Sequence, residues 1–126
     1  MLHDYTTVTP VGVAKAADDA IATGEELIAA IVGHGGPRTW ADTMAPLDTL
    51  GDVMVRAFSY GPFLGRVHPD KAVRDAGQAA EEKLQKWNSD LVFRRDLYEA
   101  MKQVAETGRG PKDQIASMGC SIKWKE

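Results

Sequence analysis

Apolar residues recur every three or four positions along most of this chain, which is the period of a helix with one buried face. Thr9 is a residue type that caps helices, and Pro10 then takes the first helical position, where a missing N–H costs nothing. Glycines and a proline at residues 33–37 end the pattern. The first helix is therefore predicted between them, and its small residues predict a closely packed neighbour. Its apolar positions are Val13, Ala17, Ala20, Gly24, Leu27 and Ile31.

A second helix is predicted to open at Thr39, because Asp42 follows three residues later and completes a variant of the capping box. Pro46 lies inside the periodic stretch and predicts either a kink or a helix that properly begins near it. Glycines and a proline at residues 61–65 predict a connection. The apolar stripe consists of Trp40, Met44, Leu47, Leu50, Met54 and Phe58.

The third helix has the clearest pattern, with Asp70 at the cap position. Glu82 and Lys86 are spaced for an i,i+4 ion pair. A fourth helix is predicted from about Asp96, and residues 107–111 stop it. The third stripe contains Val73, Ala76, Ala80, Leu84, Trp87 and Leu91, and the fourth contains Leu97, Met101 and Val104.

The fold class that follows is all-α, an up-and-down bundle of about four helices, two of them long. Residues 1–106 form this helical domain, and residues 107–126 form a divergent tail. We expect that tail to be the least protected from hydrogen exchange, because its apolar content drops. Met118, Ile122 and Trp124 are the residues there that could anchor it.

A chain of 126 residues forms one domain, and its net charge of −3 argues against nucleic acid as a partner. One cysteine, Cys120, excludes an internal disulfide. The N-terminus lacks the pattern of a signal peptide, and no apolar run approaches the ~20 residues that span a bilayer. We therefore expect a cytoplasmic protein without a membrane partner.

Candidate catalytic residues are few. His3, His34 and His68 do not form an H-E-x-x-H zinc motif, and we expect them to face solvent or to cap helices. Cys120 has Lys123 nearby, which favours the thiolate, but no base is paired with it, so an incidental thiol is the stronger interpretation. No catalytic, cofactor-binding or metal-binding residue is predicted.

Other polar and aromatic positions have structural explanations. The glycines at residues 33–36 follow a helix, unlike a phosphate-binding loop, which follows a strand. The aromatic residues on the stripes are expected in the core, namely Trp40, Phe58 and Trp87. The acidic residues of the first helix are expected to face solvent, namely Asp18, Asp19, Glu25 and Glu26.

Two passages resemble a known family. Residues 37–47 (Pro-Arg-Thr-Trp-Ala-Asp-Thr-Met-Ala-Pro-Leu) are similar to a helix-opening segment near the N-terminus of the thimet-oligopeptidase family of zinc metallopeptidases, which includes oligopeptidase A. Residues 68–76 (His-Pro-Asp-Lys-Ala-Val-Arg-Asp-Ala), followed by Leu84, Leu91 and residues 95–98, resemble the next helical stretch. The likeness runs from about residue 5 to about residue 106.

The resemblance implies a helical wall beside a channel that admits short peptides. The family's zinc belongs to a later H-E-x-x-H helix and a downstream glutamate, neither of which this sequence contains, so no site residue is carried over. The prediction is a non-catalytic N-terminal segment of an intracellular zinc oligopeptidase, inactive alone, whose partner is the catalytic domain. The alternative is a stand-alone helical interaction module or homo-oligomer. A fragment, a truncated gene product and a natural short protein all remain open.

Overall fold

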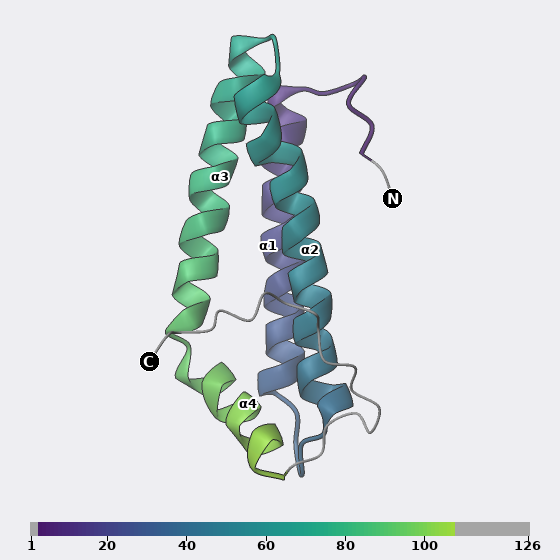
Figure 1. The fold of residues 1–126 in the computed structure, drawn as a ribbon, viewed down its shortest axis with the longest axis vertical. Helices are drawn as coiled ribbons and strands as arrows, with labels where there is room; N and C mark the ends of the chain where they lie inside the picture. Colours follow the sequence, from purple (N-terminus) through teal and green to yellow (C-terminus); the bar gives the residue numbers. More distant parts are fainter. Residues whose placement is uncertain (1–2, 108–126) are drawn as a thin grey trace, which may run out of the picture.

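The computed structural model describes residues 3–107, which form four helices and, within that range, no strand. These are α1 (Pro10–Val32), α2 (Trp40–Val67), α3 (Lys71–Val92) and α4 (Arg95–Thr107). The first three run up and down beside one another, and α4 lies across the end where α1 meets α2 (Figure 1). The predicted all-α bundle is confirmed, with three helices of 22 residues or more where two long ones were expected.

Local capping chemistry sets the starts of the three long helices. The hydroxyl of Thr9 accepts from the amide of Gly12 at 3.0 Å, and the carboxylate of Asp70 accepts from the amide of Ala72 at 2.9 Å. Thr39 and Asp42 form the reciprocal capping box at the start of α2. All three starts are where the sequence predicts them, because each cap is satisfied within three residues of itself.

The predicted connection at residues 61–65 is wrong, because α2 continues through Pro62 to Val67. Pro46 also lies inside this helix, which begins at Trp40 rather than near the proline. The glycines allow α3 to approach closely: a Cβ atom at Gly77 would lie 2.6 Å from the Gly61 carbonyl oxygen and 2.6 Å from the Gly65 Cα. Here glycine serves helix packing and does not break the helix.

The main core lies between α1, α2 and α3, where Val13, Ile28 and Leu84 are fully buried. A smaller cluster joins Ile31 at the end of α1 to Leu97 and Ala100 of α4. Most predicted stripe positions are buried, but Leu27 is only partly buried beside Ile28. Trp40 keeps 38% of its surface exposed, so its placement in the core was wrong.

Arg38 holds α4 to the end of the bundle. Its guanidinium donates to the carbonyl oxygen of Ile31 and, at 3.3 Å, to that of Val32, both at the C-terminal end of α1. Its Nε donates to the side-chain oxygen of Gln103 in α4 at 3.1 Å. One side chain thereby adds hydrogen bonds to the last carbonyls of α1, of which that of Ile31 also accepts from the His34 amide, and contacts the neighbouring helix.

Candidate functional site

The three histidines are not brought together. His34 lies in the α1–α2 connection and His68 in the α2–α3 connection, at opposite ends of the bundle. His3 contacts the carbonyl oxygen of Arg56 at 3.1 Å, and His68 caps the C-terminal end of α2. Across residues 3–107, no three His, Cys, Asp or Glu side chains are grouped so as to hold a metal ion.

Among the described residues, the nearest approach to an acid–base pair is His34 with Asp42, whose Nε2 and Oδ2 atoms lie 3.3 Å apart. Asp42 is engaged in the cap: it accepts from the Thr39 hydroxyl at 2.7 Å and from the Thr43 hydroxyl at 2.8 Å. The Thr39 hydroxyl is the main cause that lowers the pKa of Asp42 to about 2. A carboxylate held ionised in this way stabilises a helix start and is a poor general base at neutral pH.

This cap predicts acid-dependent stability. The pKa of Asp42 is about 2 in the folded chain and about 3.9 for an unfolded aspartate, so its stabilisation is complete above the higher value. That stabilisation is lost as the pH falls through about 2. We expect Asp42→Asn to flatten the decrease in melting temperature between about pH 4 and pH 2. Asp48→Asn, at an exposed position of the same helix, is the control, and equal flattening in both would contradict the prediction.

The glycines between α1 and α2 form a connection, as predicted, with Gly36 in the left-handed region at a φ of 86°. The start of α2 that follows is already capped by Thr39 and Asp42. Because a negative carboxylate occupies this helix start, a phosphate would meet repulsion there. Cys120, Lys123 and the expected anchors Met118, Ile122 and Trp124 lie outside the described residues.

The acidic residues of α1 do more than face solvent. Glu25 accepts from the indole N–H of Trp87 in α3 at 2.6 Å and lies 3.5 Å from a guanidinium nitrogen of Arg94. Asp18 pairs with Lys83 of α3. The contacts with Trp87 and Lys83 tie α1 to α3, and Arg94 adds a contact from the connection between α3 and α4. Within α3, the predicted pairing of Lys86 with Glu82 is wrong, because Lys86 instead pairs with Asp90 at 2.9 Å.

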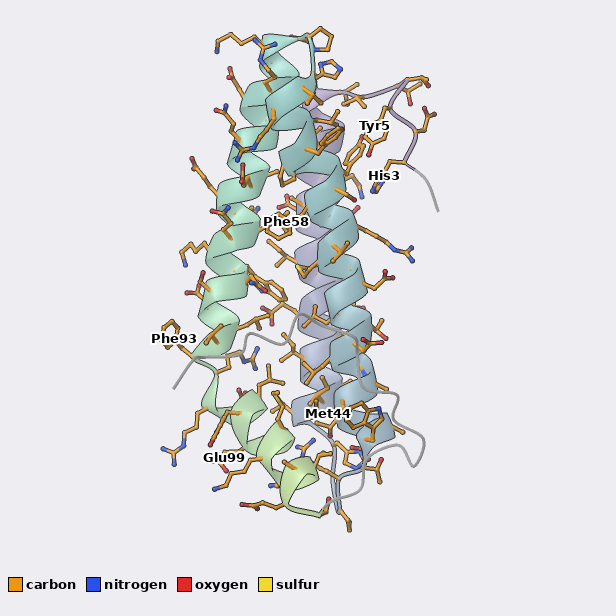
Figure 2. The ribbon with its side chains drawn as sticks, viewed as in Figure 1. His3, Tyr5, Met44, Phe58, Phe93 and Glu99 are labelled. Atoms are coloured by element: carbon orange, nitrogen blue, oxygen red, sulfur yellow. The ribbon has the colours of Figure 1, made fainter. Side chains whose placement is uncertain are left out.

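An apolar surface lies where α4 meets the start of α2 and the end of α3. We call it the α4 face and define it by Trp40, Met44, Tyr98, Met101 and Ala105. Tyr98 is 61% exposed and Met101 is 39% exposed. Met44 lies on the α2 side of the α4 face, at the end of the bundle that α4 crosses (Figure 2).

Two hollows flank the centre of this face, and Tyr98 and Met101 line both. The first measures about 400 Å³, lies toward the C-terminal half of α4 and is completed by Trp40, Met44, Lys102, Val104 and Ala105. The second measures about 320 Å³, lies toward the N-terminal half of α4 and is completed by Asn88, Leu91, Val92, Arg94 and Leu97. The walls of both hollows consist chiefly of apolar side chains, which can pack against the side chains of another polypeptide.

A second group of aromatic side chains lies on α2 and differs from the α4 face, because the N-terminal segment of the chain packs against it. Tyr5 of the N-terminal segment stacks on Tyr60 of α2, with ring centroids 6.0 Å apart, and meets Phe63 edge-on. The Tyr5 hydroxyl donates to the carbonyl oxygen of Ser59 at 3.1 Å. The N-terminal segment is thus already the partner of this part of α2.

Comparison with models of protein families, with curated proteins and with solved structures finds no match to this chain. Over residues 3–107, the helices are too short or too polar to cross a membrane. Sequence reasoning missed the α4 face because Trp40 and Met101 were both assigned to the core. Tyr98, three positions before Met101, was the available signal that the apolar stripe of α4 is wider than one neighbour covers.

Proposed function

We propose that this chain is a non-catalytic helical docking module that binds another polypeptide through the α4 face. The exposed apolar side chains of this face, gathered around two hollows, carry the proposal. Contiguous exposed apolar surface on a protein of this size marks interaction sites. Tyr98 and Trp40 also belong to the residue types that dominate binding energy at interfaces.

The first candidate partner is the catalytic part of a zinc oligopeptidase, as the resemblance implies. The supporting observation is that both family-like passages contribute to the same surface. Residues 37–47 supply Trp40 and Met44, and residues 95–98 supply Tyr98. In this proposal the module forms a wall of a peptide channel, and the parent activity is hydrolysis of short peptides inside the cell.

The second candidate is a stand-alone module that associates with itself. The order of charged residues along α4 favours this candidate, since the positive and negative positions exchange places when the order is reversed and the stripe is therefore complementary to an antiparallel copy of itself. The two candidates use one surface and therefore exclude each other on a single molecule. A catalytic part added in excess would displace a second copy.

Binding to the catalytic part can be measured directly. The full chain is titrated by calorimetry into a zinc oligopeptidase expressed without its N-terminal helical segment. We expect saturable binding that Tyr98→Glu weakens by at least about a hundredfold, as for a central interface aromatic. Val55→Glu is the matched control, because Val55 is 68% exposed but lies on α2 away from the α4 face. Equal weakening by both variants would contradict a role for this face.

A non-catalytic role also predicts an absence of activity in the isolated chain. We expect purified protein to hold no stoichiometric zinc and to leave short fluorogenic peptides uncleaved above background. The reason is that the sequence supplies no paired histidine and glutamate ligands of the zinc-peptidase type. About one tightly bound zinc per chain by metal analysis would overturn this expectation.

A further inference from the structure

Four charged residues form one stripe along α4, next to Tyr98 and spaced by four, three and four positions. In chain order they are Arg95, Glu99, Lys102 and Glu106, so their signs alternate from positive to negative. Glu99 extends from α4 away from the three long helices (Figure 2). The side chains of Arg95 and Glu106 are 90% and 64% exposed. The stripe is therefore accessible beside the apolar centre of the face.

Within one chain these charges are weakly paired. Arg95 and Glu99 approach to 3.9 Å, and Lys102 and Glu106 approach to 3.8 Å. The two ends of the stripe have unfavourable signs for the helix dipole, since Arg95 sits at the positive N-terminal end of α4, where Asp96 is the one residue of favourable sign in the first turn. The last turn contains Glu106 and no basic residue.

The geometry points to a second copy of this chain as an occupant of the α4 face, with the two α4 helices packed antiparallel about a two-fold axis. Reversing the order of the stripe exchanges its signs. Arg95 then faces Glu106 of the partner subunit, and Glu99 faces Lys102 of the partner subunit. Each partner thereby supplies a negative charge at the N-terminal end of α4 and a positive charge at the C-terminal end, as the helix dipole favours.

The apolar residues at the centre of the α4 face fit the same antiparallel packing of the two α4 helices. Tyr98 lies in the N-terminal half of α4, so it comes to lie opposite the C-terminal half of the partner's α4. That half borders the larger hollow, of about 400 Å³. An exposed aromatic side chain thus meets an open apolar hollow, and the symmetry makes this contact twice.

The size of the face sets the expected affinity. The exposed fractions of Trp40 and Tyr98 correspond to roughly 200 Å² of aromatic surface, at about 200 Å² for each whole side chain. A standard interface buries about 800 Å² per partner. The aromatic surface of the α4 face is therefore well below the area of a standard interface. We therefore expect reversible dimerisation with a dissociation constant in the micromolar range.

Sedimentation equilibrium of the full chain tests the dimer. We expect a concentration-dependent monomer–dimer equilibrium that Tyr98→Glu shifts to monomer, with the dissociation constant rising at least about a hundredfold. Val55→Glu should leave the equilibrium unchanged, and circular dichroism should show that both variants stay helical. A wild-type monomer at all accessible concentrations, or a dimer that Tyr98→Glu leaves intact, would overturn the inference.

Charge reversal tests the antiparallel arrangement. Glu99→Lys alone and Lys102→Glu alone should each weaken the homodimer by about tenfold, because each places like charges opposite one another twice. The double variant should recover the wild-type dissociation constant, and mixing the two single variants should form a heterodimer. In a parallel pair each residue faces its own copy, so single reversals would leave the affinity unchanged and overturn the arrangement. Binding of the catalytic part by a monomeric chain would overturn the dimer and leave the docking function standing.

Discussion

Replacing Gly77 with alanine is expected to lower the free energy of unfolding by about 2–3 kcal/mol. The added Cβ would lie 2.6 Å from the Gly61 carbonyl oxygen and 2.6 Å from the Gly65 Cα, both of them backbone atoms of α2. Backbone atoms cannot rotate away as a flexible side chain can, so α2 and α3 must separate. This cost exceeds the ~1 kcal/mol that alanine gains over glycine in helix propensity.

Gly51 provides the matched control in α2, because a Cβ there would meet no atom within 4 Å. Gly51→Ala should therefore show the propensity gain alone and raise the free energy of unfolding by about 0.5–1 kcal/mol. Chemical denaturation monitored by circular dichroism measures both variants. Stabilisation by both substitutions would mean that α2 and α3 are not in close contact at Gly77.

Replacing Trp87 with alanine is expected to cost about 3 kcal/mol, the lower end of the range for large aromatic residues, because the ring is only partly buried. The indole occupies space that Gly24 leaves free, where a Cβ at position 24 would collide with the Cη2 atom of the ring and would lie 2.9 Å from its Cζ2 atom and 3.1 Å from a methyl carbon of Leu50. Truncation would open a cavity between α1, α2 and α3. Thermal melts should show a large decrease, and a melting temperature within a degree or two of the wild type would place the ring at the surface.

The Glu25→Ala variant separates hydrogen bonding from packing. It keeps the whole indole ring but removes the carboxylate that accepts from its N–H at 2.6 Å. We expect a loss of about 1 kcal/mol, because Glu25 is exposed and a hydrogen bond of this kind contributes about that much net stability. A loss as large as that of Trp87→Ala would show that the hydrogen bond, and not the packing, dominates.

The starts of the long helices could be predicted because each cap is closed by neighbouring residues. Thr9, Thr39 and Asp70 each accept a hydrogen bond from an amide two or three positions later, so a short window of sequence contains both partners. The glycines of α2 could not be interpreted in this way. Gly61 and Gly65 look like a helix stop in isolation, and only the passage of Gly77 beside them shows why they lack side chains.

The α4 face likewise shows which features follow from the sequence and which depend on the tertiary structure. By itself, the sequence determined an all-α bundle, its long-helix caps and the absence of an H-E-x-x-H motif. Periodicity also located the apolar side of each helix relative to that helix's own axis. Only the tertiary structure decided which apolar side chains have a neighbour: Ile31 and Leu97 are covered by each other's helices, whereas Trp40 and Tyr98 are left exposed. The physical reason is that burial depends on how many helices pack around a residue, and a one-dimensional pattern records only that residue's own helix.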